Sequence, residues 1–179
     1  MTKNKLLRAI AIITIIVINV GCDQVSKNIV RQQLAPYVNL TYLHGHLQVT
    51  RVENTGAFLS LGDNMHGPLR TILLSVFPAL LLIMGINYLL KNTAMSKITF
   101  LGICFIIGGG IGNIFDRIWH GSVTDFIYIE YQPFHTGVFN VADLSITTGA
   151  LLIIIGLNVQ NPPGFLRRHR VETDIEETS

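Results

Sequence analysis

Four long apolar runs limit what this chain can fold into. The runs are residues 6–22, 71–90, 98–115 and 141–159. Each is close to the roughly 20 residues that a helix needs to cross a bilayer. Only 13% of the 179 residues are charged, whereas soluble domains average about 25%. We therefore expect an α-helical integral membrane protein in which residues 1–179 form a single domain with four transmembrane helices.

Charged residues predict the direction of these helices. A cytoplasmic N-terminus places eight of the thirteen basic residues in the cytoplasm, namely Lys3, Lys5, Arg8, Lys91, Lys97, Arg167, Arg168 and Arg170. This agrees with the excess of Lys and Arg in cytoplasmic loops. Every acidic residue before Glu172 then falls on the outer side: Asp23, Glu53, Asp63, Asp116, Asp125, Glu130 and Asp143. The rule for basic residues does not explain this acidic cluster, so we expect an outward-facing polar site.

The first run has two interpretations. Lys3, Lys5 and Arg8 precede a short apolar stretch, which is also typical of a cleaved signal peptide. Residues 19–22 resemble the lipobox of a lipoprotein precursor cleaved before Cys22, although Asn19 stands where a lipobox usually has Leu. Because three more apolar runs follow, we favour a retained transmembrane helix. A non-enzymatic membrane lipoprotein is the alternative.

The connection after the first run is too long to be a simple turn. Residues 36–67 are expected to form a small β lobe on the outer membrane surface. Within it, residues 46–53 alternate imperfectly between apolar and polar side chains, and residues 54–56 have turn chemistry before a second apolar stretch, 57–61. This pattern favours a hairpin. Residues 164–179, at the other end of the chain, are expected to form a disordered tail.

Two features within the runs predict how the helices are shaped and packed. Pro78 predicts a kink in the second span, which membrane helices tolerate. A glycine cluster in the third span, formed by Gly108, Gly109, Gly110 and Gly112, predicts close approach of a neighbouring helix.

Several kinds of site are not expected. Cys22 and Cys104 lie at or inside apolar runs, so they do not suggest a disulfide framework. His44 and His46 could share one face of a strand, but no spacing matches the HExxH or paired CxxC motifs of zinc sites. We expect neither a metal nor a cofactor. The net charge of +2 argues against a nucleic-acid surface.

Between the third and fourth runs, residues 113–143 hold polar side chains where membrane depth makes them costly. Asp125 lies in the short connection, and Asp143 opens the fourth run. Two carboxylates that approach closely cannot both ionise at neutral pH, so one keeps a proton and the other can act as a base. We hypothesise a catalytic pair of Asp125 and Asp143. The alternative is that both are cap or interface carboxylates, with Asp143 serving its helix N-terminus.

Other polar residues could support this pair. Asn54, Asn113 and Asn140 can donate and accept hydrogen bonds, so they could fix the carboxyl groups or hold a substrate carbonyl. Asp116 and Arg117 are adjacent at a helix end. An ion pair or an interfacial anchor is the simpler interpretation there, and we prefer it for Asp116.

Two other functions fit the sequence less well. A serine–lysine dyad of Ser26 and Lys27 is disfavoured because sequence neighbours point different ways on a helix. A small channel or transporter could use the same carboxylates to relay protons. A conduction path, however, needs polar groups through the full depth of the membrane, and here they collect at one interface.

Five short motifs resemble those of one family, the lipoprotein signal peptidases, also called signal peptidase II. The motifs are DQVSK (23–27), ENTGAF (53–58), GGxxGNxxDR ending at Arg117, VTDF (123–126) and FNVAD (139–143). They occur in the family's order and spacing across almost the whole chain. Thr124 stands where the family often has Val.

This resemblance implies an aspartic endopeptidase of the bacterial inner membrane. We expect it to be a monomer in contact with membrane lipid and to bind no nucleic acid. Four transmembrane helices would place both termini in the cytoplasm, and the periplasmic face would carry a small β-cradle and a short interfacial helix. The implied catalytic dyad is Asp125 and Asp143, and the implied substrate-binding or supporting residues are Asp23, Asn54, Gly56, Asn113, Arg117 and Asn140. The implied substrates are prolipoproteins whose Cys bears diacylglyceryl, cut on the amino side of that Cys.

Overall fold

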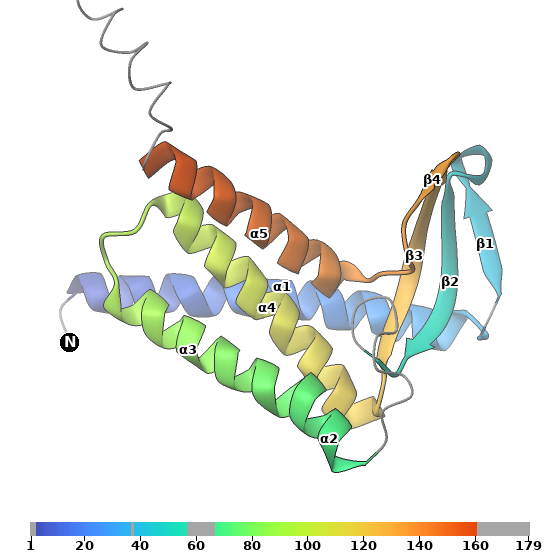
Figure 1. The fold of residues 1–179 in the computed structure, drawn as a ribbon, viewed down its shortest axis with the longest axis horizontal. Coiled ribbons are helices and arrows are strands. Elements are labelled where there is room, and N and C mark those ends of the chain that lie inside the picture. Colours follow the sequence, from blue (N-terminus) through green and yellow to red (C-terminus); the bar gives the residue numbers. More distant parts are fainter. Residues whose placement is uncertain (1–2, 37, 57–66, 161–179) are drawn as a thin grey trace, which may run out of the picture.

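The computed structural model describes residues 3–36, 38–56 and 67–160, and its helices confirm the expected membrane architecture (Figure 1). Among these residues, four helical segments are long and apolar enough to cross a membrane: Asn4–Gln33, Pro68–Lys91, Lys97–His120 and Val141–Val159. Their elements are α1 (Lys3–Gln33), the consecutive α2 (Pro68–Thr71), η3 (Ile72–Val76) and α3 (Phe77–Lys91), then α4 (Lys97–His120) and α5 (Val141–Gln160). The predicted tail, 164–179, lies outside the described residues.

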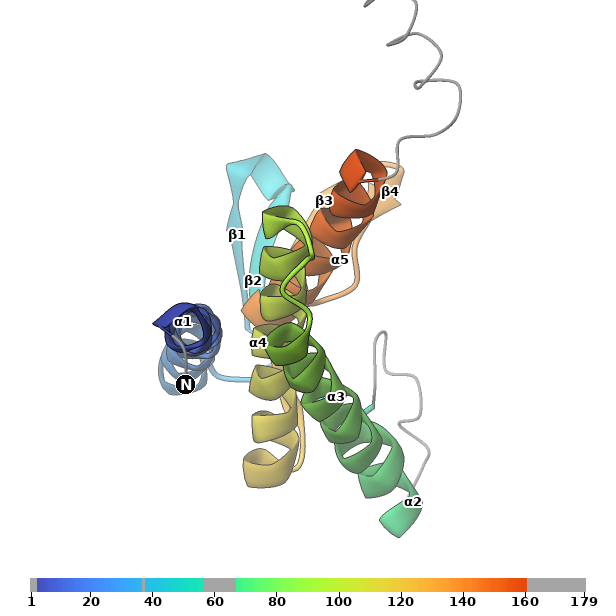
Figure 2. The ribbon, with the colours of Figure 1, turned by 90° about the vertical axis from the view of Figure 1, so that its left-hand side faces the viewer.

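Helix α4 is the centre of the bundle, and α1, α3 and α5 all pack against it (Figures 1 and 2). The start of α1, the connection from α3 to α4 and the end of α5 lie at one end of the bundle, opposite the sheet (Figure 1). Arg8 holds this end together, because its guanidinium donates hydrogen bonds to the carbonyl oxygens of Leu89 (2.8 Å) and Asn92 (2.7 Å) at the end of α3.

Glycines allow α4 and α5 to approach closely, as the sequence predicts. A methyl group on Gly102 of α4 would lie 2.6 Å from the carbonyl oxygen of Gly149 in α5. A methyl group on Gly109 would collide with the carbonyl oxygen of Ala142, in the first turn of α5. Because no side chain fits between these backbones, α5 begins pressed against the middle of α4.

The second span changes its hydrogen-bond pattern next to the predicted kink. Pro78 has no backbone N–H to donate to a carbonyl one turn earlier. The preceding turn, η3, is a π-helix, in which the N–H of Phe77 bonds to the carbonyl oxygen of Ile72. Such turns occur mostly as local interruptions of α-helices and often at functional sites.

Helix α1 continues well beyond the predicted span of 6–22. Its 31 residues correspond to about 46 Å, more than the roughly 30 Å of the hydrocarbon core. The sequence turns polar after Cys22, which is why hydropathy places the end of the span there. The helix persists because Asp23, Lys27 and Arg31 are paired with α5, α4 and the sheet.

The β lobe is a four-stranded antiparallel sheet in the order β1-β2-β3-β4. Its strands are β1 (Asn39–Tyr42), β2 (Leu47–Asn54), β3 (Val123–Tyr131) and β4 (Phe134–His135), with the short helix η1 (Leu43–Gly45) between β1 and β2. The lobe is therefore built from two distant parts of the chain. The sheet lies beside the end of α1 and the start of α5 (Figure 1).

The sequence did not predict β3, which carries Asp125. The strand partners that the structure shows for β2 are β1 and β3. The predicted hairpin partner, residues 57–61, lies outside the described residues. Between α1 and α2 the described residues hold one short helix, the single turn η1 that joins β1 to β2. Residues 57–66 lie outside the described residues, so the interfacial helix implied by the resemblance stays a prediction.

Candidate active site

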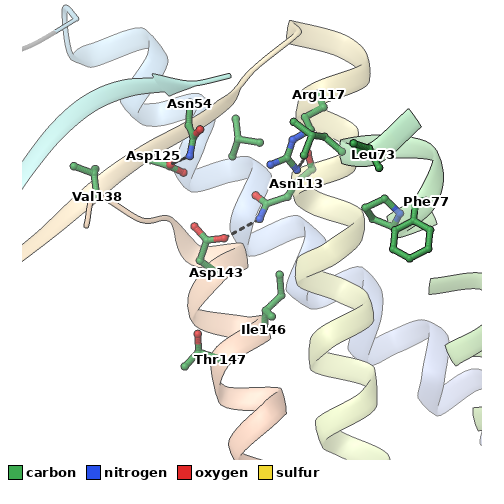
Figure 3. Close-up of a pocket in the computed structure, with 13 residues that line it drawn as sticks. Asn54, Leu73, Phe77, Asn113, Arg117, Asp125, Val138, Asp143, Ile146 and Thr147 are labelled. Atoms are coloured by element: carbon green, nitrogen blue, oxygen red, sulfur yellow. Dashed lines mark hydrogen bonds between the residues drawn. The ribbon is translucent and has the colours of Figure 1, made fainter. Parts of the chain in front are cut away.

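One cavity, where the bundle meets the sheet, gathers most of the polar residues singled out by the sequence (Figure 3). Its volume is about 590 Å³. It is lined by Asn54, Leu73, Leu74, Phe77, Pro78, Asn113, Arg117, Val123, Asp125, Val138, Asp143, Ile146 and Thr147. Two carboxylates thus share a cavity with an apolar wall formed by the second span and α5.

Strand β3 holds Asp125 at this cavity with only 3% of the residue exposed. Its Oδ2 accepts a hydrogen bond from Nδ2 of Asn54 (2.9 Å), and its Oδ1 accepts one from Nδ2 of Asn140 (2.6 Å). Burial raises the pKa of Asp125 to about 6; the bond from Asn54 opposes this rise and the nearby charge of Asp143 adds to it. Asp125 therefore exchanges its proton closer to neutral pH than an exposed Asp does.

Asp143 lies in the first turn of α5, where it both caps the helix and faces the cavity. Its Oδ2 accepts a hydrogen bond from the backbone N–H of Asn140 (3.2 Å), whose Oδ1 accepts one from the backbone N–H of Asp143 (2.9 Å). This reciprocal pair is a capping box. The other carboxylate oxygen, Oδ1, accepts a hydrogen bond from Nδ2 of Asn113 (2.8 Å; Figure 3). The cap therefore orients Asp143 while one oxygen stays directed at Asn113.

Asn54, Asn113 and Asn140 each direct their amide NH2 at a carboxylate. In each case a group that can only donate a hydrogen bond binds the amide oxygen, so the NH2 must face the other way. For Asn54 this group is the backbone N–H of Gly56 (3.0 Å). For Asn113 it is the ammonium group of Lys27 (2.9 Å). For Asn140 it is the backbone N–H that closes the capping box. Hydrogen-bond polarity thus determines which way each amide faces.

Lys27 supports the site, although the sequence did not predict this role. It is fully buried, and its Nζ contacts Oδ2 of Asp23 (2.8 Å), Oδ2 of Asp116 (2.9 Å) and Oδ1 of Asn113 (2.9 Å). A buried ammonium group is stable only when paired and hydrogen-bonded in this way. The available signal was the spacing of Asp23 and Lys27, which puts opposite charges on one face of a helix.

Asp23 and Arg117 connect the elements around the cavity. Oδ1 of Asp23 accepts a hydrogen bond from the backbone N–H of Ala142 (2.9 Å), so α1 also caps the start of α5. Nη2 of Arg117 donates to the carbonyl oxygen of Gly56 (2.9 Å), which ties α4 to the chain just after β2. Arg117 itself lines the cavity (Figure 3).

Asp116 and Ser26 each have a partner other than the residue next to it in the sequence. Asp116 does form ion pairs, but with Lys27 and with Arg31 (3.0 Å), both on α1. The adjacent Arg117 is not its partner in these pairs. The hydroxyl of Ser26 donates to the backbone carbonyl oxygen of Asp23 (2.8 Å), so Ser26 and Lys27 do not form a catalytic dyad.

Carboxylates and amides dominate the polar chemistry of this cavity. In the part of the chain that the structure describes, no group of three or more His, Cys, Asp or Glu side chains is arranged to hold a metal ion. The two carboxylates can hold and deprotonate a water molecule, and the amides can stabilise the resulting charges.

Fold and site together define a class of protein, a four-span membrane protein with a carboxylate pair at one end of its bundle. The family model described as "Signal peptidase (SPase) II" matches residues 15–159. The chain belongs to the signal peptidase II family and is a membrane peptidase.

Relatives and solved structures agree with this assignment. The lipoprotein signal peptidase of Pseudoalteromonas atlantica is 35% identical over 136 residues, which is 75% of this chain and 81% of the relative. That of Maridesulfovibrio salexigens is 32% identical over 159 residues, 87% of this chain and 96% of the relative. A solved bacterial membrane enzyme superimposes with a TM-score of 0.74 at 27% identity, covering 86% of this chain and 92% of its own.

Proposed function

We propose that this chain is an aspartic endopeptidase that removes signal peptides from diacylglyceryl-modified prolipoproteins, cutting on the amino side of the lipidated Cys. Membership of the signal peptidase II family supports the substrate class. The observation that carries the mechanism is the convergence of Asp125 from β3 and Asp143 from α5 on one cavity (Figure 3).

The pair would divide the work of general base and general acid. We assign the role of base to Asp143, because the capping box and the amide of Asn113 fix its carboxylate at the cavity. It would take a proton from a water molecule that attacks the scissile carbonyl carbon. Asp125, whose pKa is raised to about 6, would hold the dyad's proton and give it to the leaving amine.

Two neighbours of the pair would hold the peptide. The guanidinium of Arg117 lines the cavity and is itself fixed by the carbonyl oxygen of Gly56. It can donate to a substrate carbonyl or stabilise the oxyanion of the tetrahedral intermediate. Leu73, Phe77 and Ile146 form apolar walls suited to a signal helix and to acyl chains.

We further propose that the protein works as a monomer in the bacterial inner membrane, with both termini in the cytoplasm. Lys5, Arg8, Lys91 and Lys97 belong to the end of the bundle opposite the sheet, as a cytoplasmic end requires. The cavity then opens at the periplasmic face. A lipidated Cys would reach it from the outer leaflet while the signal helix stays in the bilayer.

The test is cleavage by the purified protein of one prolipoprotein presented with and without diacylglyceryl on its Cys, with the product's new N-terminus identified by mass spectrometry. We expect cleavage of the modified form alone, with the lipidated Cys as the new N-terminal residue. A cut at another bond, or equal cleavage of the unmodified precursor, would overturn the proposed substrate.

A further inference from the structure

A second group of polar contacts lies behind Asp125, on the other face of β3. Thr124 is fully buried, and its hydroxyl oxygen accepts a hydrogen bond from Nε of Arg31 at the end of α1 (2.8 Å). The same hydroxyl donates to the carboxylate of Glu53 in β2 (3.1 Å to Oε2). We propose that Thr124 is a positioning residue for the carboxylate pair, an inference that rests on the proposed function.

Strand register explains how Thr124 acts on the site without touching it. Glu53 pairs with Thr124 across the two strands, and Asn54 pairs with Val123. Since side chains alternate along a strand, Glu53 and Thr124 lie on one face, and Asn54 and Asp125 lie on the other. The bond between Asn54 and Asp125 (2.9 Å) therefore sits directly behind the contact of Thr124 with Glu53. A shift between β2 and β3 would therefore change both the Thr124–Glu53 contact and the Asn54–Asp125 hydrogen bond.

The other partner of Thr124 connects it to the second half of the site. Nη2 of Arg31 pairs with Asp116 (3.0 Å), and Asp116 also pairs with Lys27 (2.9 Å), one turn earlier on α1. Lys27 holds Asn113, the amide that bonds the α5 carboxylate. Two successive turns of α1 thus support the two carboxylates, one through Asn113 and the other through Thr124.

The carboxylate of Glu53 accepts hydrogen bonds from Thr124 and from two further donors. Ser122 donates to its Oε2 (2.8 Å) and Nε of Arg51 donates to its Oε1 (3.0 Å). Burial tends to raise the pKa of Glu53, but the hydrogen bonds, led by that from Ser122, outweigh burial and lower it. Thr124 adds a donor from β3 to the carboxylate of Glu53, and it gives Nε of the part-buried Arg31 an acceptor. A threonine hydroxyl satisfies both at once.

The test compares Thr124→Val, which keeps the shape and removes the hydroxyl, with Thr124→Ser, which keeps the hydroxyl. Thr99→Val is the matched control, because Thr99 is also buried and its hydroxyl forms a hydrogen bond with Ser96 (2.9 Å) at the start of α4, the end away from the site. For the lipidated precursor we expect Thr124→Val to lower kcat about tenfold with KM within about twofold, since small misplacement of reacting groups mainly slows chemistry. Thr124→Ser and Thr99→Val should keep kcat within about twofold.

Amide hydrogen exchange in detergent measures how easily β2 and β3 open near the site, and it needs no activity assay. Thr124→Val should speed exchange in residues 123–127 and 52–54, whereas Thr124→Ser should not. Unchanged exchange in Thr124→Val, unchanged kcat, or equal loss in Thr124→Ser would overturn the inference. If the wild-type protein does not cut the lipidated precursor, the proposed function fails, and exchange alone decides the role of Thr124.

Discussion

At the scale of single residues, the direction of the Asn113 amide is set by Lys27, a neighbour that takes no part in the proposed reaction. The ammonium group of Lys27 can only donate, so Asn113 turns its oxygen to Lys27 and its NH2 to Asp143. The same ammonium group separates two buried carboxylates, Asp23 and Asp116. Lys27 therefore links the stability of the bundle to the geometry of the site.

Replacing Lys27 with Met tests this link. The variant keeps an unbranched side chain but leaves Asp23 and Asp116 buried without their cation, and breaking a buried ion pair costs about 3–5 kcal/mol. We expect a lower free energy of unfolding in detergent and loss of most cleavage activity. Lys97→Met, at an exposed lysine at the start of α4, is the control and should change stability by less than about 0.5 kcal/mol. Wild-type stability and activity in Lys27→Met would contradict the link.

The raised pKa of Asp125 predicts how stability depends on pH. Because its folded-state pKa of about 6 lies above the ordinary 3.8, the folded protein holds this proton more tightly than the unfolded chain. This contribution to stability is present below about pH 4 and is lost as the pH rises through about 6. Unfolding of wild type and Asp125→Asn should be compared from pH 4 to pH 7.5.

The wild type should lose roughly 2–3 kcal/mol relative to Asp125→Asn over that pH range, because one pKa unit corresponds to about 1.4 kcal/mol. Any pH-independent effect of the substitution on stability cancels, because the test uses only how the difference in unfolding free energy changes with pH. A flat difference, or one with the opposite slope, would contradict the raised pKa.

At the scale of elements, hydropathy predicted the helices well and the sheet poorly. A helix that crosses a membrane needs a long apolar run, so the runs in the sequence predict such helices well. Three of the four predicted spans lie within a few residues of the observed helices. The extension of α1 was missed because its polar residues are paired with other elements. Strand β3 was missed because residues 123–126 are buried on both sides, so they lack the alternation that marks a half-buried strand.

Close packing of α4 on α5 is the element-level feature that holds Asp143 in place. Gly109→Ala would push a methyl group against the carbonyl oxygen of Ala142. Overpacking of this kind costs about 1–3 kcal/mol, so we expect a lower unfolding temperature together with reduced cleavage. Gly21→Ala, where a methyl group meets nothing within 4 Å, is the matched control and should leave stability equal or slightly higher. Equal behaviour of the two variants would contradict this role of Gly109.

At the scale of the whole molecule, the site lies where α4 and the start of α5 meet the end of β2 and the start of β3, with the second half of α1 behind them (Figure 1). The residues of the carboxylate pair and its asparagines were predictable, since carboxylates and amides at membrane depth are costly and conspicuous. The contacts that hold these residues in place were not predictable, because Lys27, Arg31 and Thr124 act through partners about 85 to 95 residues away in the sequence. The substitution of Thr for the family's common Val looked neutral in sequence, yet its hydroxyl joins α1 to β2.

The most direct test of the account is cleavage of the diacylglyceryl-modified precursor by wild type, Asp125→Asn and Asp143→Asn, with folding of each variant verified by thermal unfolding in detergent. We predict that both variants stay folded and lose at least about a thousandfold in kcat, as expected when an acid or base is removed, while a chelator leaves the wild type active. A folded variant that cuts at near the wild-type rate would show that its carboxylate is structural and would contradict the dyad.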